Sequence, residues 1–199
     1  MHRQPLLSAL EHYASCHLDE TEMVNRFQRF VEAHPRCFER SLASPGHVTG
    51  SAWIVDPAGE AVLLTHHRKL DLWIQLGGHA DGDPDVLAVA RREGLEESGL
   101  RSLEVIDPGA DVNAGSDTGI RIPFDVDIHE IPARREEPAH FHFDVRYAFR
   151  AGSRDVVTSD ESHALAWVPM EELDRYTMDV SVQRMAKKWL ALCVRVPGV

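Results

Sequence analysis

Cysteine is scarce in this sequence, and long apolar runs are absent. The 199 residues include three cysteines, Cys16, Cys37 and Cys193, which are widely separated and lack the C-x-x-C spacing of zinc knuckles. This odd, scattered set favours reduced thiols and a cytoplasmic location over a disulfide framework. No stretch reaches the roughly 18 consecutive apolar residues of a transmembrane helix, and the N-terminal segment lacks the apolar core of a secretory signal. We therefore expect no membrane partner and no secretory leader.

Positive charge is also in short supply. Lysine and arginine total 21 against 32 aspartates and glutamates, so the formal net charge is -11. That balance argues against general nucleic-acid binding and against binding to anionic membranes. A small anionic substrate remains compatible, provided that a metal ion and a few local cations offset its charge. The length fits one globular domain with a small appendage, and a homodimer is compatible with it.

The segment 77–100 carries the strongest local signal. Asp83 followed by Pro84 predicts the start of a helix, because an Asp side chain caps free backbone N–H groups and Pro suits the first helical position. Gly99 predicts the end of this helix. One face is apolar near the start and acidic near the end. Its apolar positions are Val86, Val89 and Ala90, and its acidic positions are Glu93, Glu96 and Glu97.

Three carboxylates on one face at the end of a helix need an explanation. Side chains three and four residues apart are neighbours, so these groups repel one another, and they also face the negative end of the helix dipole. A hard divalent cation such as Mg²⁺, which prefers carboxylate oxygens, would offset that repulsion. A solvated acidic helix end is the alternative interpretation.

The segment 78–100 resembles the Nudix box, G-x5-E-x7-R-E-U-x-E-E-x-G-U, in which U is a bulky aliphatic residue. The matching positions are Gly78, Arg92, Glu93, Glu96, Glu97, Gly99 and Leu100. Two positions depart from the pattern: Pro84 stands in place of the first acidic residue, and Gly94 stands in place of an aliphatic. The chain is therefore similar to the Nudix hydrolases in its most specific motif.

The resemblance implies an α/β fold, a Nudix-like α/β/α sandwich with a mixed β-sheet, plus an N-terminal helical extension. Residues 1–43 are assigned to the extension and residues 44–199 to the Nudix hydrolase domain. Residue periodicity and turn residues predict the elements in detail. Helices are expected over 5–42, 84–98, 170–176 and 180–196, and strands over 47–55, 61–67, 72–76, 101–106, 120–131, 140–150 and 165–168. The strand 72–76 is expected to run into a glycine loop. In the first helical segment, the buried stripe is predicted to consist of Met23, Phe27, Phe30 and Val31.

The activity implied by the resemblance is hydrolysis of the pyrophosphate linkage in a nucleoside diphosphate joined to another moiety, such as a nucleotide sugar or a dinucleotide. The implied cofactor is Mg²⁺ or Mn²⁺. Its implied ligands are Glu93, Glu96, Glu97 and the backbone carbonyl of Gly78. Arg92 is implied to hold a box carboxylate in position, and Glu96 is also counted among the catalytic groups. The partner is a small-molecule nucleoside diphosphate derivative, and markers of the known substrate subgroups are too incomplete to name it.

The general base is expected in the loop 158–162, because Nudix enzymes often draw it from a loop outside the box. Glu161 is the candidate, with Asp160 beside it as the second choice. An exposed acidic turn before the strand 165–168 is the alternative interpretation.

Histidine is unusually frequent, with twelve in the chain. His140 and His142 are two residues apart on a predicted strand, so they share one face of the sheet, and His129 lies on a neighbouring predicted strand. These residues are candidates for a second metal site or a phosphate grip, and ordinary polar-face histidines are the alternative. We expect His79, beside the glycine pair, to contact the substrate together with His140 and His142.

Two other functions remain open. The order of strands before the box, with His47 and His79, faintly resembles isopentenyl diphosphate isomerase, but that enzyme needs a cysteine near the start of the box and none occurs between Cys37 and Cys193. A non-catalytic Nudix-fold nucleotide-binding module is favoured by the departures at Pro84 and Gly94. The intact carboxylates of the box favour an enzyme over both.

Overall fold

The computed structural model describes residues 2–108, 121–134, 138–160 and 162–195. The helices are α1 (Gln4–Cys16), α2 (Thr21–Ala33), α3 (Val86–Ser98), α4 (Leu173–Tyr176) and α5 (Val180–Arg195), with short 3-10 helices η1 (Leu18–Glu20) and η2 (Met170–Glu172). The strands are β1 (Gly46–Val55), β2 (Ala61–His67), β3 (Leu72–Ile74), β4 (Leu76–His79), β5 (Leu103–Ile106), β6 (Asp125–Ile131), β7 (His140–Ala151) and β8 (Ser162–Pro169). None of these helices is both long and apolar enough to cross a bilayer.

The strands form a sheet in which hydrogen bonds join β3, β2, β1, β7 and β5 in that order. Outside this path, β4 pairs with β1, β6 with β7 and β8 with β2. The mixed sheet and its helices confirm the expected α/β fold, and α1 and α2 precede the sheet as the expected helical extension.

The chain divides into two compact units, which are described in turn. The first unit comprises 1–50, 78–89 and 107–146, and the second comprises 51–77, 90–106 and 147–199. The strands β1 and β7 and the helix α3 each contribute residues to both units.

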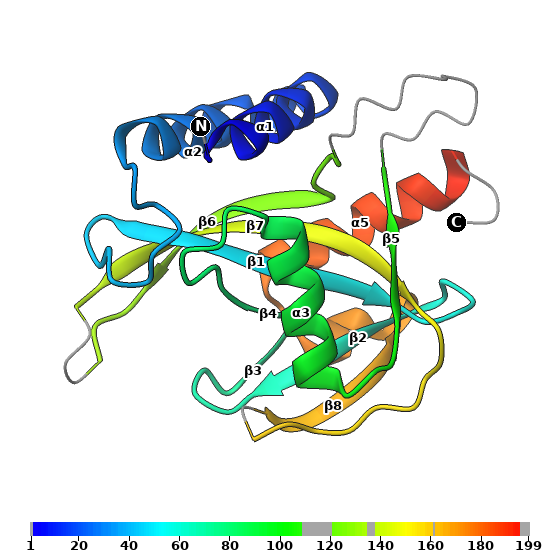
Figure 1. Ribbon diagram of the computed structural model, residues 1–199. Coiled ribbons are helices and arrows are strands. Elements are labelled where there is room, and N and C mark those ends of the chain that lie inside the picture. The colour runs from blue at the N-terminus through cyan, green and yellow to red at the C-terminus, as the bar shows by residue number, and fades with distance from the viewer. Residues whose placement is uncertain (1, 109–120, 135–137, 161, 196–199) are drawn as a thin grey trace. The chain divides into compact units, whose positions relative to one another are not determined.

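In the first unit, α1 and α2 lie side by side (Figure 1). The buried face of α2 includes Phe27, Phe30 and Val31, as predicted, but its fourth member is Val24 rather than Met23. Phe30 stacks on Phe143 of β7 with the ring centroids 3.6 Å apart. The apolar stripe of α2 therefore packs against the sheet.

The region 5–42, predicted to be helical, is helical over α1, η1 and α2 but not beyond Ala33. The chain leaves the α-helical conformation at His17, continues through η1, and the second helix ends at Ala33. Pro35 disfavours helical backbone at the residue before it, which explains the end of α2. From residue 35 onward the segment consists mainly of turns, in which Cys37 and Phe38 are buried.

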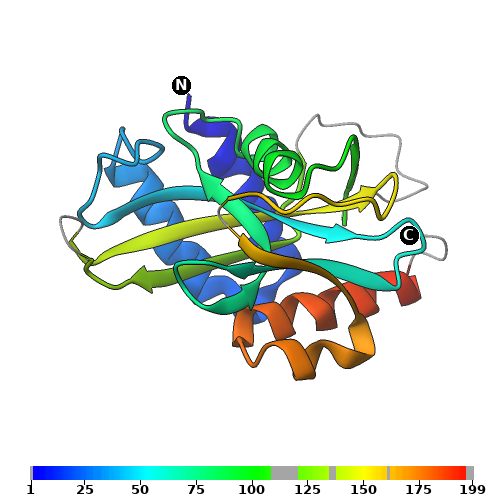
Figure 2. The same ribbon diagram turned by 90° about the horizontal axis from the view of Figure 1, so that it is seen from below.

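The paired strands β6 and β7 run antiparallel, side by side (Figure 2). The predicted strand 120–131 begins only at Asp125, and its first predicted residue lies outside the described residues. Successive strand residues point to opposite faces, so the apolar side chains that contact α2 alternate with polar ones. The polar side chains of β7 on one face are His140, His142, Asp144 and Arg146.

The helix α3 begins later than predicted. Asp85, not Asp83, is its cap, because its Oδ1 accepts a hydrogen bond from the N–H of Ala88 at 3.0 Å and its carbonyl accepts one from Val89. Pro84 therefore precedes the cap, and the helix ends at Ser98, as the glycine at position 99 predicts. The glycine pair, expected in a loop, lies within β4.

In the second unit, β2 pairs antiparallel with β3 and with β8.

The packing around Gly94 of α3 explains one departure from the box. A Cβ atom at this position would lie 3.0 Å from the side chain of Leu103, 3.1 Å from Ala52 and 3.2 Å from Ile54. The helix therefore approaches β1 and β5 too closely for an aliphatic side chain.

Replacing Gly94 by Val tests this close packing. We expect Gly94→Val to lower the free energy of unfolding by about 1–3 kcal/mol, because overpacking forces neighbouring side chains out of their rotamers. Urea denaturation measures the change. Ala88→Val, at an exposed position of the same helix, is the control and should lose less than about 1 kcal/mol. Equal losses in the two variants would contradict the packing argument.

The thiol of Cys37 should resist alkylation. It is fully buried, and burial raises its pKa to about 11, so at pH 8 it stays almost entirely protonated and hidden from reagent. We expect iodoacetamide at pH 8 to modify the exposed Cys16 first and to modify Cys37 only after unfolding, as measured by peptide mass spectrometry. Modification of both at the same rate in the folded protein would contradict this expectation.

Candidate functional site

The acidic residues of α3 differ in their surroundings. Glu97 is buried, with 8% of its surface exposed, and its Oε1 accepts a hydrogen bond from the N–H of Gly77 at 3.4 Å. Glu93 is half-buried and forms an ion pair with Arg92, whose Nη2 lies 2.7 Å from its Oε1. Glu96 is exposed. The structure thus brings Arg92 to Glu93 and Gly77 to Glu97, and it leaves Glu96 exposed to solvent.

These donors fit the metal that the fold family implies. Carboxylate oxygens are the ligands that Mg²⁺ and Mn²⁺ prefer, and the carboxylate of Glu97 is buried at the end of the box helix. Glu93 shares the helix face and has the same hard oxygen donors. Gly78, whose carbonyl is a predicted ligand, is half-buried within β4.

The loop that was predicted to supply the base is anchored at both ends. The N–H of Val157 donates to the carbonyl of Ser98, the last residue of α3, at 2.7 Å. At the other end, Ser162 bonds to Thr65 of β2 through their hydroxyl groups. Gly99 has a φ of +67°, and a Cβ there would lie 2.9 Å from Val157, so only glycine suits this junction. Glu161 lies outside the described residues, and Asp160 is exposed.

Most of the predicted site histidines lie on one polar face of the first unit. His129 of β6 is the direct partner of His142 of β7, and their ring centroids are 5.5 Å apart. His140 stacks on His47 of β1 with the centroids 5.0 Å apart. The sequence prediction that His129, His140 and His142 share a region is therefore matched by their positions.

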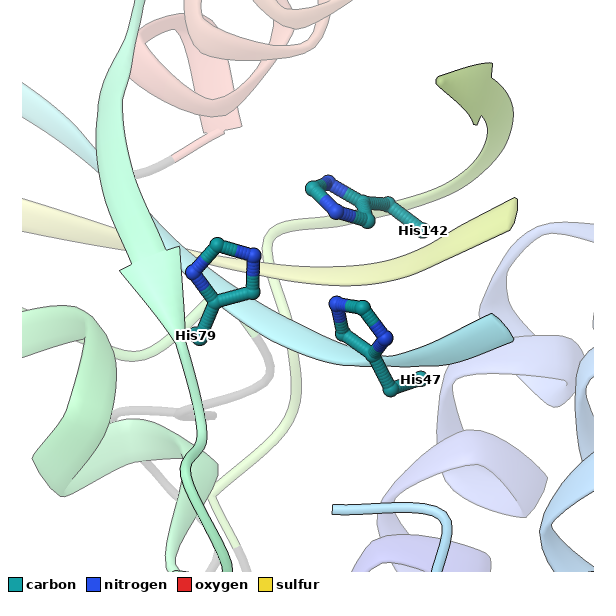
Figure 3. A group of neighbouring side chains, drawn as sticks. All are labelled: His47, His79 and His142. Atoms are coloured by element: carbon teal, nitrogen blue, oxygen red, sulfur yellow. The ribbon is translucent and has the colours of Figure 1, made fainter. Parts of the chain in front are cut away.

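Three of the histidines converge most closely. One ring nitrogen from each of His47, His79 and His142 lies within 4.8 Å of the other two, and the three rings face a common space (Figure 3). They come from β1, β4 and β7, and all belong to the first unit. The residue pattern predicted His79 and His142 as site residues but did not predict His47. A pattern that could have identified His47 is the alternation of His47 and Thr49 with the apolar Val48, which resembles the polar positions of β7.

Burial favours the neutral form of the His47 and His142 imidazoles. Burial lowers the pKa of His142 to about 2, with the neighbouring imidazoles acting in the same direction. Burial also lowers the pKa of His47. A neutral imidazole can bind a metal ion through its ring-nitrogen lone pair, and its remaining N–H can donate a hydrogen bond to a phosphate oxygen. The electrostatics are therefore compatible with both the metal site and the phosphate grip.

The same polar face continues into a buried ion cluster centred on Arg146. Its guanidinium donates to Asp144 at 2.7 Å, to Asp125 at 2.9 Å and to Asp127 at 3.2 Å. Burial lowers the pKa of Arg146, but the three carboxylates outweigh that effect and raise it, so the side chain stays charged. Thr49 also donates to Asp144, at 2.9 Å, which ties β1 to β7.

Comparison with known proteins identifies the family. The NUDIX domain model matches residues 46–190. The chain belongs to the Nudix family. The resemblance of the box is thereby confirmed, and the protein is placed among the Nudix hydrolases. A comparison with curated proteins found no match.

Several solved structures share the fold of this Nudix protein. A Nudix-family hydrolase from Clostridium perfringens is 24% identical, with a TM-score of 0.55 over 73% of this chain and 97% of the other. The dihydroneopterin triphosphate pyrophosphohydrolase of E. coli is 16% identical, with a TM-score of 0.53 over 72% and 94%. The Nudix hydrolase RenU of M. smegmatis is 17% identical, with a TM-score of 0.52 over 77% and 89%. At these identities the likeness shows the fold.

Removing the guanidinium of Arg146 should destabilise the Nudix protein strongly. Arg146→Met leaves three carboxylates without their shared cation, two of them almost fully buried, and we expect a loss of about 3–5 kcal/mol in the free energy of unfolding. Chemical denaturation followed by circular dichroism measures it. Arg29→Met, at an exposed position of α2, is the control and should change stability by less than about 0.5 kcal/mol. A loss below about 1 kcal/mol in Arg146→Met would contradict this role.

Proposed function

We propose that this Nudix protein is a divalent-metal-dependent pyrophosphohydrolase. Its substrate is a nucleoside diphosphate joined to another moiety, and the hydrolysed bond is the pyrophosphate linkage. The observation that carries the proposal is the arrangement of the box carboxylates: Glu97 is buried beside the backbone of Gly77, and Glu93 is held by Arg92. Membership of the Nudix family supports the same reaction class.

The metal ligands in this proposal are Glu93, Glu96, Glu97 and the carbonyl of Gly78. When bound, Mg²⁺ or Mn²⁺ supplies charge neutralisation for the phosphates and makes a coordinated water more acidic. Arg92 acts as a positioning residue, because its ion pair restrains the side chain of Glu93. Glu96 is exposed and therefore has the most freedom to take part in proton transfer or to complete the ligand set.

The general base in this proposal is Glu161, or Asp160 beside it. The hydrogen bond from Val157 to Ser98 supports the choice, since it ties the start of this loop to the end of the helix that carries Glu97. A base near the box must accept the proton of the attacking water, and a carboxylate on an anchored loop suits that task. We also assign His79, His140 and His142 as residues that contact the substrate.

Four further properties are proposed from the sequence. They are a domain boundary between residues 43 and 44, a cytoplasmic location, a small-molecule partner rather than nucleic acid or membrane, and a homodimer. The isomerase and the binding module are retained as alternatives that the experiment below separates.

A substrate screen and one conservative variant test the proposal. Purified protein is incubated with nucleotide sugars, dinucleotides, coenzyme A, nucleoside triphosphates and isopentenyl diphosphate, each with Mg²⁺ or Mn²⁺. Released phosphate products, isomerised diphosphate and ligand binding are measured. We expect Glu97→Gln to fold normally and to lower turnover of the active substrate by about 100-fold or more, the scale of losing one electrostatic stabiliser. Chelation by EDTA should abolish turnover.

Glu104→Gln is the matched control, because Glu104 is an exposed glutamate of β5 in the same unit as Glu97. Turnover at the normal rate in Glu97→Gln would overturn the metal assignment. Nucleotide binding without any hydrolysis would favour the binding module. Interconversion of isopentenyl and dimethylallyl diphosphates without hydrolysis would favour the isomerase.

A further inference from the structure

We infer that His47, His79 and His142 form a binding site for a divalent transition-metal ion of the Zn²⁺ class. Their ring nitrogens lie within 4.8 Å of one another, and no carboxylate belongs to this group among the residues that the structure describes. Imidazole nitrogen suits Zn²⁺, Co²⁺ and Ni²⁺, whereas Mg²⁺ prefers oxygen. The site therefore differs in its chemistry from the carboxylates of α3.

Two unpaired nitrogen atoms point to a ligand at this position. The Nε2 atoms of His47 and His142 are buried, and neither has a hydrogen-bond partner within the described part of the chain. His47 is 2% exposed, so solvent does not reach it freely. Buried polar atoms in proteins are nearly always paired, and each exception calls for a water, an ion or a functional reason. A metal ion would accept the lone pairs of both atoms at once.

The surroundings hold the rings in the orientation that a metal needs. His47 Nδ1 lies 3.4 Å from the carbonyl of Leu42, and a hydrogen bond from Nδ1 to this carbonyl leaves the Nε2 lone pair directed at the shared space. His140 packs against His47 while its own Nδ1 bonds to the carbonyl of Pro138 at 2.9 Å. His129 packs against His142 while its Nδ1 lies 3.1 Å from Asp127. These two histidines support the site rather than join its ligands.

The separation of the nitrogens is close to what coordination requires. Bonds of about 2.0–2.1 Å in a tetrahedral zinc site place the ligand nitrogens about 3.4 Å apart. The three ring nitrogens lie within 4.8 Å of one another, so metal binding would require small rotations of the rings about their side-chain bonds. Three protein ligands leave a fourth position for water or for an anionic oxygen, such as that of a phosphate.

The inference shares His79 and His142 with the proposed function but uses none of the box carboxylates, so zinc binding and hydrolysis can be tested separately. Metal-free protein is prepared by dialysis against a chelator and is titrated with Zn²⁺ by calorimetry and with Co²⁺ by visible absorption. We expect one equivalent of Zn²⁺ to bind, with a Co²⁺ spectrum typical of a four-coordinate site with three nitrogen ligands and one oxygen ligand. His142→Ala and His79→Gln should each weaken Zn²⁺ binding by at least about 100-fold, because direct ligands matter at least as much as the groups that orient them.

His12→Ala, at an exposed histidine of α1, is the matched control and should bind Zn²⁺ normally. Glu97→Gln should also keep its zinc, which separates this inference from the proposed hydrolase function. His79 is only half-buried, so we expect His79→Gln to fold. This variant still tests the inference if circular dichroism shows that His142→Ala does not fold. The inference is overturned if the wild type binds no Zn²⁺ below about 10 µM, or if the folded histidine variants bind as tightly as His12→Ala.

Discussion

A single buried arginine governs the part of the molecule on which the histidines depend. Arg146 holds Asp125, Asp127 and Asp144 on the paired strands β6 and β7, and this cluster forms only in one register. A slip of one residue would turn every side chain of a strand to its opposite face. His142 would then point toward α2, and Phe143 would enter the polar face. The ion cluster thus fixes the register, and the register fixes the position of the histidines.

The strand β7 is buried on both faces, and each face has its own chemistry. Phe143 packs against Phe27 and Phe30 of α2, which excludes water from one side. The other side carries histidine, aspartate and arginine where an ordinary core would be apolar. Burying ionisable groups is costly unless partners satisfy them, so such a face is typical of a strand that serves function as well as packing.

The sequence predicted those features that depend on local patterns. The bounds of β2 follow from a β-rich run between turns, and Val86, Val89 and Ala90 are buried as their spacing predicted. The place of His47 beside His142 was missed because it depends on which strands become neighbours, and no local pattern encodes that choice. The sequence does not locate the break at His17, because neither Gly nor Pro marks it. Asp83 and Asp85 are equally good caps by residue type, and only the backbone path decides between them.

The contacts of the segment between α2 and β1 limit where an expression fragment of this chain can begin. Cys37 accepts a hydrogen bond from Val48, Phe38 accepts one from Gly82, and Leu42 lies beside the ring of His47. A fragment that begins where the family model begins, at residue 46, would lose all three backbone partners at once. The segment that follows α2 is thus hydrogen-bonded to residues of β1 and of the loop after β4. An expression fragment should include this segment and the helices before it, so that the first unit keeps its native contacts.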